Sequence, residues 1–212
     1  MEYKKIPPTV INRLPRYHRY LCELMEEGIT KISSKELSEK MGTTASQIRQ
    51  DFHYFGGFGQ QGYGYSVPFL YEEIAKMLGI DKKQNFIVIG AGNLGKAIAN
   101  YPNFESRGFL LKAIFDKDPN LTGKKVRGYT IRAIEDLEDF LSKEEVKIAT
   151  LAIPKEESKS LVEDLVRLGI KGIWNFSHID LEVPEDVVVE NVHISESLMK
   201  LSYHLSNKNY KK

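Results

Sequence analysis

Residues 85–95 read Asn85-Phe86-Ile87-Val88-Ile89-Gly90-Ala91-Gly92-Asn93-Leu94-Gly95, and this stretch decides the fold of the larger part of the chain. Its apolar first half is typical of a buried parallel strand. The three glycines that follow have the spacing of a dinucleotide-binding turn, which needs a tight turn, a close approach of the backbone to a pyrophosphate, and close packing of helix on strand. A helix that begins near Asn93 directs its positive end at the phosphates. The predicted cofactor contacts here are Gly90, Ala91, Gly92, Asn93, Leu94 and Gly95.

A carboxylate follows the next apolar run. Residues 109–115 form a second predicted strand that ends at Asp116, about 20 residues past Gly95. A carboxylate at this place binds the adenine ribose hydroxyls and repels a 2′-phosphate, which favours NADH and NAD over their phosphorylated forms. Lys117, which is also a candidate cofactor contact, weakens that preference. The alternative for Asp116 is a turn residue at a strand end.

Strands and helices continue to alternate after this point. Residues 134–141 and 155–168 are predicted helices, and residues 146–153 and 170–175 are predicted strands, with another strand starting at residue 187. The order predicts a Rossmann-like, doubly wound parallel sheet over residues 81–192. Such folds bind ligands in a crevice at the carboxyl ends of the strands. The candidates to line it are Tyr101, Pro102, Ile153, Pro154, Asn175 and Phe176.

The first 80 residues have a different pattern. Pro15 suits the first turn of a helix whose apolar residues recur with helical spacing up to Met25. Ser33 and Glu36 form a predicted capping box for the next helix. A further helix starts at Thr44, and the short connection across residues 41–43 predicts a helix-turn-helix.

The outward face of the second helix in this motif suits a DNA major groove. Arg49 can donate two hydrogen bonds to a guanine, whereas Gln50 prefers adenine. The alternative is a plain solvated helix face. The candidate DNA contacts on this helix are Ala45, Ser46, Arg49, Gln50 and His53.

A glycine-rich segment with interleaved aromatic residues follows at residues 54–65. It predicts a hairpin with its tip near Gln60 and Gln61, and after a DNA-reading helix such a hairpin would be a wing that contacts DNA. An ordinary hairpin without DNA contact is the alternative. Residues 1–80 are thus predicted to form a winged-helix DNA-binding domain, in which Arg13 and Arg16 of the basic N-terminal segment add DNA contacts.

Residues 193–212 contain one more predicted helix. Its apolar residues form one stripe, Ile194, Leu198, Leu201 and Leu205. The helix can pack on its own domain, or across a two-fold axis onto a second copy of the chain.

The bulk composition agrees with a globular protein of two domains. The 212 residues carry a net charge of +1, so the whole chain has no basic excess for nucleic acid. The single cysteine, Cys22, excludes an internal disulfide and a multi-cysteine zinc site, and its place on the apolar side of a predicted helix indicates a buried thiol. No metal site is predicted. The charged N-terminus and the lack of a long apolar run predict a cytoplasmic protein with no membrane partner.

Over nearly its full length the chain resembles the Rex family of redox-sensing transcriptional repressors. The matching stretches are Arg13–Tyr17, Gln47–Phe52, Tyr54–Gly56, Phe58-Gly59, Gly62–Tyr65, Gly90–Gly95, Tyr101-Pro102, Ile170–Phe176 and Leu198–Leu205. The resemblance implies a homodimer that swaps its C-terminal helices. It also implies binding to operator double-stranded DNA with an inverted repeat, and release from that DNA when NADH binds. NAD is expected to compete weakly without causing release.

The resemblance also implies roles for single residues. Arg49 is expected to contact a guanine, and Arg16 to lie at the hinge between the two domains. Tyr101 and Ile194 are expected near the nicotinamide.

Four positions, in three places along the chain, differ from what the family commonly has. Gln50 and the pair Gln60-Gln61 replace basic residues, so fewer phosphate contacts, a flatter salt dependence and a shifted operator preference are expected. His193 replaces an aspartate. A histidine changes charge between about pH 5 and 8, so it can make release pH-sensitive. The alternative is a solvated histidine that precedes a helix.

A nucleotide site without a substrate domain, joined to a DNA-binding motif, predicts a sensor and not an enzyme. Two alternatives remain, an NAD-dependent oxidoreductase and a module that binds CoA or another nucleotide. No protein partner other than a second copy is evident from the sequence.

Overall fold

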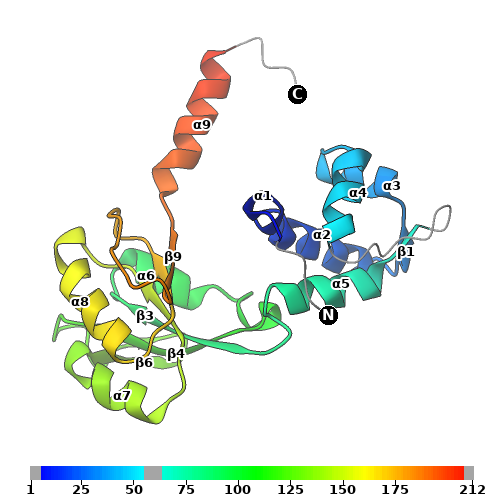
Figure 1. Ribbon diagram of the computed structural model, residues 1–212. Coiled ribbons are helices and arrows are strands. Elements are labelled where there is room, and N and C mark those ends of the chain that lie inside the picture. The colour runs from blue at the N-terminus through cyan, green and yellow to red at the C-terminus, as the bar shows by residue number, and fades with distance from the viewer. Residues whose placement is uncertain (1–5, 55–63, 208–212) are drawn as a thin grey trace. The chain divides into compact units, whose positions relative to one another are not determined.

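The computed structural model describes residues 6–54 and 64–207 (Figure 1). Contacts divide the chain into two compact units, Met1–Lys82 and Lys83–Lys212. Each unit has its own hydrophobic core.

The first unit is built from helices and one small antiparallel strand pair, in which Ile32 lies opposite Tyr65. Its elements are α1 (Pro8–Ile11), α2 (Leu14–Glu26), β1 (Lys31–Ile32), α3 (Ser34–Met41), α4 (Ala45–Tyr54), β2 (Tyr65–Ser66) and α5 (Val67–Met77).

Local hydrogen bonds set the boundaries of α3 and α4 as the sequence predicts. Ser33 Oγ accepts from the Glu36 amide at 3.1 Å, and Glu36 Oε2 accepts from the Ser33 amide at 2.8 Å, which completes the capping box. Gly42 ends α3 with a φ of 58°, a left-handed conformation that favours glycine. Thr44 Oγ1 then accepts from the Gln47 amide at 3.1 Å and starts α4. The predicted helix-turn-helix is confirmed.

The core of the first unit lies between α2, α4 and α5. Tyr17 and Leu21 of α2 and Phe52 of α4 are fully buried, and Leu70 of α5 packs in the same cluster. The helix α5 was not predicted from the sequence, although Pro68 in its first turn is a helix-start signal. The predicted wing, with Gln60 and Gln61 at its tip, lies outside the described residues, and α4 and β2 flank that segment.

The second unit is a seven-stranded sheet in the order β5-β6-β4-β3-β7-β8-β9, and every neighbouring pair is parallel except β5 with β6. Its strands are β3 (Gln84–Ile89), β4 (Phe109–Asp116), β5 (Lys125–Val126), β6 (Tyr129–Ala133), β7 (Ile148–Leu151), β8 (Gly172–Asn175) and β9 (Val188–Asn191). Its helices are α6 (Asn93–Asn100), η1 (Glu105–Arg107), η2 (Ile134–Asp136), α7 (Leu137–Lys143), α8 (Lys155–Arg167) and α9 (Ile194–Ser206).

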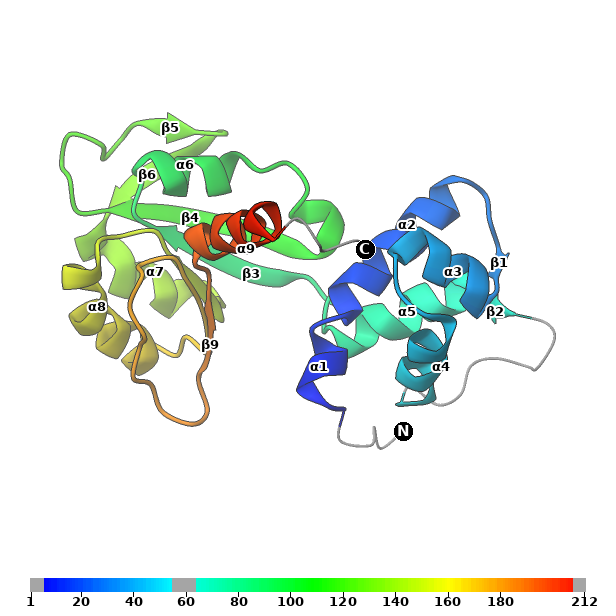
Figure 2. The ribbon, with the colours of Figure 1, turned by 90° about the horizontal axis from the view of Figure 1, so that it is seen from above.

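Helices pack on both faces of this sheet, as expected for a doubly wound fold (Figure 2). Alternate residues of β3 point to opposite faces. Ile87 and Ile89 pack with residues of α7 and α8. Phe86 and Val88 pack instead with Ile98 of α6. The predicted fold class is confirmed.

Two details of the sheet differ from the sequence prediction. The β5–β6 hairpin at the sheet edge was not predicted, because β5 has only two residues and carries too few apolar positions for a recognisable alternation. Its turn contains Arg127 and Gly128 with positive φ values of 50° and 84°. The strand predicted over residues 146–153 is shorter, since only residues 148–151 pair with a neighbour.

The helix α9 exposes its apolar residues. Leu198 and Leu205 are 64% and 70% exposed, and Ile194 and Leu201 are exposed as well. None of the residues of α9 is buried in this chain. The described part of the chain therefore does not bury the predicted apolar stripe.

Two further predictions concern single features. Cys22 is not buried as predicted but partly exposed, because it lies at the edge of the buried face of α2, and its thiol contacts Glu26. Within the described ranges, none of the helices has the length and apolar character needed to cross a membrane.

Candidate nucleotide cleft and DNA-reading helix

A cleft of about 570 Å³ opens at the carboxyl ends of β3 and β7, which are neighbours in the sheet. This is the place where a doubly wound sheet binds ligands. The cleft brings together six of the predicted cofactor residues, Gly90, Gly92, Asp116, Lys117, Ile153 and Pro154.

The three glycines of the turn have three different surroundings. Gly90 has a φ of 97°, and a Cβ there would collide with the Ala152 carbonyl. A Cβ at Gly95 would collide with the Gly90 carbonyl oxygen, because the helix α6 packs against the turn. Gly92 precedes α6 and has no atom within 4 Å of an ideal Cβ position. The backbone at Gly92 is therefore open to a ligand, whereas Gly90 and Gly95 serve the packing of the turn.

Asp116 is held in place by backbone amides. Its Oδ2 accepts from the Ala91 amide at 2.5 Å, and its Oδ1 accepts from the Asp118 amide at 2.8 Å. A carboxylate has about four acceptor sites, so two are left for ribose hydroxyls. Beside it, Lys117 Nζ lies 2.7 Å from Glu157 Oε1.

The other predicted cofactor residues lie apart from the described lining of the cleft. Tyr101 follows α6, is 41% exposed and packs against Phe104 with ring centroids 4.9 Å apart. Ile194 is the first residue of α9 and is exposed. Asn175 is buried at the end of β8, where its amide donates to Ile179 O and Asn191 Oδ1. The roles of Tyr101 and Ile194 at the nicotinamide stay predictions.

The outward face of α4 is as expected from the sequence. Ser46, Arg49, Gln50 and His53 are exposed, and Ala45 is half-buried. Arg49 Nη1 donates to Ser34 Oγ at 3.1 Å, in the first turn of α3. Ile48 and Phe52 face the core from the opposite side. The exposed face is thus available to DNA, and its base contacts stay predictions.

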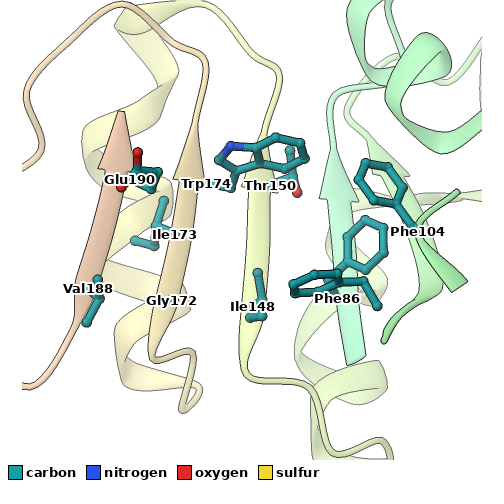
Figure 3. A pocket seen from close by; sticks show the side chains of 10 residues that line it. Phe86, Phe104, Ile148, Thr150, Gly172, Ile173, Trp174, Val188 and Glu190 are labelled. Atoms are coloured by element: carbon teal, nitrogen blue, oxygen red, sulfur yellow. The ribbon is translucent and has the colours of Figure 1, made fainter. Parts of the chain in front are cut away.

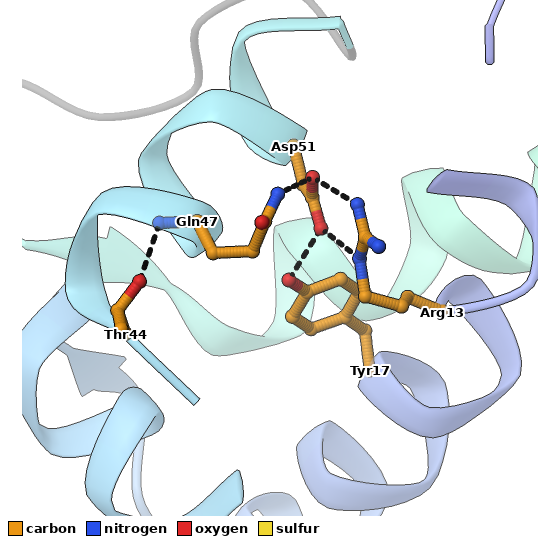
Figure 4. A network of polar contacts seen from close by, with 5 residues as sticks. All are labelled: Arg13, Tyr17, Thr44, Gln47 and Asp51. Carbon is orange, nitrogen blue, oxygen red and sulfur yellow. Dashed lines mark hydrogen bonds and ion pairs between the residues drawn. The ribbon is translucent and has the colours of Figure 1, made fainter. Parts of the chain in front are cut away.

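A buried carboxylate joins α4 to α2 (Figure 4). Asp51 is fully buried, and its oxygens accept two hydrogen bonds from Arg13, at 2.6 and 2.8 Å. They also accept from Tyr17 Oη at 2.7 Å and from Gln47 Nε2 at 2.8 Å. Four hydrogen bonds therefore satisfy one buried carboxylate.

Burial and hydrogen bonding act in opposite directions on Asp51. Burial alone would raise the pKa of Asp51. The hydrogen bonds from Arg13, Tyr17 and Gln47 lower the pKa by more than burial raises it, so the pKa lies below its ordinary value. Burial and the hydrogen bond to Asp51 both raise the pKa of Tyr17. Asp51 is thus the anion and Tyr17 the neutral donor at neutral pH.

The role of Asp51 was not predicted from the sequence. The available signal was an acidic residue between Ile48 and Phe52 on the inward face of α4, where a charge needs a partner. Two of the basic residues predicted to contact DNA, Arg13 and Arg16, have internal partners. Arg13 binds Asp51, and Arg16 Nη2 donates to the Met41 carbonyl at the end of α3. DNA contacts by Arg13 and Arg16 stay predictions.

His193 lies directly before α9 and beside a second histidine. The rings of His178 and His193 are stacked, with centroids 5.9 Å apart and an interplanar angle of 28°. His178 has a φ of 56°, which is uncommon for a residue other than glycine. Within the described ranges, no group of three or more His, Cys, Asp or Glu side chains is placed to hold a metal ion.

A second pocket, of about 320 Å³, lies over β3, β7, β8 and β9 and is mostly apolar (Figure 3). Phe86, Ile148 and Trp174 line it, and Val188 at its edge is 70% exposed. Thr150 Oγ1 at this pocket is buried without a hydrogen-bond partner among the described residues. Such a surface is typical of a place where another element docks.

Comparison with known proteins gives the same division of the chain. Residues 5–53 match the family model of a putative DNA-binding protein N-terminus, and residues 81–179 match that of a CoA binding domain. The redox-sensing transcriptional repressor Rex of Thermoanaerobacter pseudethanolicus is 58% identical over 202 residues, which are 95% of this chain and 90% of the relative. The Rex protein of Clostridium perfringens is 54% identical over the full length of both chains.

Solved structures agree with these relatives. The crystal structure of RSP in complex with β-NAD+ and operator DNA matches with a TM-score of 0.90 and 56% identity, and covers 97% of this chain and 94% of that chain. RSP in complex with β-NADH matches with a TM-score of 0.89 and 52% identity, covering 97% and 96%. RSP is described as a Rex-family repressor. With this identity over nearly the whole length, the chain belongs to the Rex family of redox-sensing transcriptional repressors.

Proposed function

We propose that this repressor binds an inverted-repeat operator as a homodimer in the cytoplasm and leaves it when NADH occupies the cleft. The observation that carries the proposal is the cleft itself, where the open backbone at Gly92 lies beside the fixed carboxylate of Asp116. A pyrophosphate fits the first and ribose hydroxyls fit the second. The solved relative RSP was crystallised with β-NADH and with β-NAD+, which supports the same ligands here.

DNA binding is assigned to α4. Its exposed face carries Arg49, whose guanidinium can donate two hydrogen bonds to guanine O6 and N7, worth about 1–3 kcal/mol of discrimination. Its buried face is fixed by the Asp51 hydrogen bonds, so the helix is held as a rigid unit. The operator DNA in the RSP complex supports this assignment.

Dimerisation is assigned to α9 and to the apolar pocket over β7, β8 and β9. Among the described residues none buries the exposed leucines of α9, and the apolar pocket lined by Trp174 opens at the exposed Val188. An exchange of α9 between two copies would cover both surfaces. A two-fold dimer also matches the symmetry of an inverted repeat.

The switch requires a difference in affinity between two dimer states. To change operator occupancy from nearly full to nearly empty, NADH must prefer the released state by about 5 kcal/mol. NAD+, which lacks this preference in the proposal, would occupy the cleft without releasing DNA.

An electrophoretic mobility shift with an inverted-repeat operator tests the proposal, with NADH or NAD+ titrated against the preformed complex. Release by NADH at a concentration at which NAD+ leaves the complex intact is the expected result. If neither nucleotide changes operator binding, the sensor mechanism is refuted. If the protein binds no operator variant, the assignment of DNA binding to α4 is refuted.

The two alternative functions are less well supported. Among the residues that the structure describes, those that line the cleft include no histidine or tyrosine for proton transfer to a substrate. The relatives are named as repressors, not as enzymes. The match of residues 81–179 to a CoA binding domain favours a CoA module as the second candidate, and competition between CoA and NADH would decide.

A further inference from the structure

The rim of the nucleotide cleft is acidic. Among the described residues that line it, the charged side chains are the carboxylates of Asp116, Asp118, Glu156 and Glu157 and the ammonium of Lys117. Asp116 is held by two backbone amides and so stays at the rim. A ligand group with two negative charges meets a net negative surface here.

Lys117 and Glu157 connect the two sides of this cleft. Lys117 follows β4, whereas Glu157 lies in the first turn of α8, and their Nζ and Oε1 atoms are 2.7 Å apart. In nucleotide sites that accept a ribose phosphate, a basic residue near the end of this strand binds that phosphate. Lys117 is in the position to do so, but its charge is paired with Glu157.

We infer that Glu157 is a specificity-determining residue, which excludes adenine nucleotides that carry a phosphate on the adenosine ribose. It does so by pairing with Lys117 and by adding a negative charge to the rim. The nucleotides concerned are NADPH, with its 2′-phosphate, and CoA, with its 3′-phosphate. The inference rests on the proposed function, because it takes the cleft to be the nucleotide site.

The pairing explains why the lysine next to Asp116 does not make the cleft a site for phosphorylated nucleotides. The contact is partly exposed, with 66% and 32% of the two side chains accessible, so it adds little to stability. Its effect is on the ligand, since a phosphate must displace Glu157 from Lys117 and also approach the remaining carboxylates. Removal of one carboxylate near a doubly charged group is expected to improve binding by about tenfold.

The test is the substitution Glu157→Gln in the full-length protein. Dissociation constants for NADH, NADPH and CoA are measured by isothermal titration calorimetry at low and at physiological salt. The ratio of NADPH to NADH affinity is expected to rise about tenfold, and CoA affinity to rise with it, while NADH affinity stays within about twofold. The gain should shrink at higher salt, because the rim charges are partly screened.

Two further variants make the test specific. Glu156→Gln removes the same charge one residue away, so it should raise NADPH affinity less than Glu157→Gln does. In a Lys117→Ala background the gain from Glu157→Gln should be smaller, because the released ammonium is absent. An equal gain in both backgrounds would overturn the role of the ion pair.

The outcomes separate this inference from the proposed function. Tight NADH binding with an unchanged NADPH to NADH ratio in Glu157→Gln would overturn the inference alone. Failure of the unsubstituted protein to bind NADH would overturn the proposed function, and the inference with it.

Discussion

The guanidinium of Arg13 donates to both oxygens of the Asp51 carboxylate, from Nε at 2.6 Å and from Nη2 at 2.8 Å. The two residues are 38 positions apart in the sequence and join the start of α2 to the middle of the DNA-reading helix α4. Asp51 has no solvent exposure, whereas about a third of the Arg13 side chain is accessible. The pair therefore fixes α4 from its buried side.

Removal of the Asp51 charge should loosen this helix. We expect Asp51→Asn to lower the free energy of unfolding by about 2–4 kcal/mol, because the uncharged amide keeps only one acceptor oxygen for Arg13 and Tyr17 and replaces the other oxygen by an NH2 donor. Operator affinity should fall, while NADH binding to the second unit stays unchanged. Urea denaturation and mobility shifts measure the two effects. Asp81→Asn, at an exposed position of the same unit, is the control, and an equally small effect of both substitutions would contradict the prediction.

The same carboxylate predicts a loss of stability in acid. The pKa of Asp51 is lower in the folded protein than its ordinary value of about 3.9, because the hydrogen bonds outweigh the effect of burial. Its contribution to stability is thus complete above about pH 5, more than one unit above the ordinary pKa, and is lost as the pH falls through the folded-state pKa.

The measurement is the free energy of unfolding of the unsubstituted protein and of Asp51→Asn from pH 7 down to the acid limit of folding. The difference between the two proteins should be constant above about pH 5 and should shrink below pH 4. A difference that stays constant into the acid range would show that Asp51 is not the group that titrates.

A structural feature can be predicted from the sequence when the residues that form it are close together along the chain. Capping boxes and glycine turns are local, and so Ser33, Gly42 and the turn from Gly90 to Gly95 were placed correctly. The β5–β6 hairpin was missed because β5 has only two residues, too few for a measurable periodicity. The partner of Asp51 could not be predicted either, because pairing over 38 residues depends on how α2 packs on α4.

In the nucleotide cleft, too, the motif was predicted and the contact between distant residues was not. The glycine spacing and Asp116 follow from a motif whose parts lie on adjacent strands, and the structure brings them together. The contact between Lys117 and Glu157 joins the end of β4 to the first turn of α8, and no pattern in the sequence indicates it. Tyr101 and Ile194 were placed near the nicotinamide by resemblance alone, and the described cleft does not include them.

The glycine turn offers a test that separates ligand binding from folding. Gly92→Ala should leave the thermal stability unchanged within about 0.5 kcal/mol, because the added methyl group meets no protein atom. It should weaken NADH binding by about tenfold or more, since the methyl group occupies the space of the pyrophosphate. Gly95→Ala should instead lower stability by about 1–3 kcal/mol, because its Cβ collides with the Gly90 carbonyl.

Thermal unfolding and NADH titration of both variants give the comparison, and each variant is the control for the other. A Gly92→Ala protein that unfolds earlier but binds NADH normally would refute the assignment of the open backbone to the ligand.

Gln50 is exposed and uncharged, so it is expected to add nothing to the salt dependence of DNA binding. Gln50→Lys should steepen the slope of log K against log salt by about 0.9 per dimer half-site, if the new ammonium reaches a phosphate. Ser142→Lys on α7 adds the same charge to the second unit and should leave the slope unchanged. Mobility shifts over a range of salt concentrations measure both variants. Equal slopes for the two would place Gln50 away from the phosphate backbone.

The apolar stripe of α9 predicts the oligomeric state. Leu201→Lys should produce a monomer at micromolar concentration. The leucine is exposed in one chain and gains free energy when a dimer buries it, whereas burial of an unpaired ammonium at the same place costs free energy. Operator affinity should fall with it, since one half-site contact remains per chain. Glu196→Gln makes the same change in net charge on the opposite side of α9 and should leave a dimer. Sedimentation equilibrium distinguishes the two. A dimeric Leu201→Lys protein would place the interface elsewhere on the chain, and α9 would then need another element to cover its leucines.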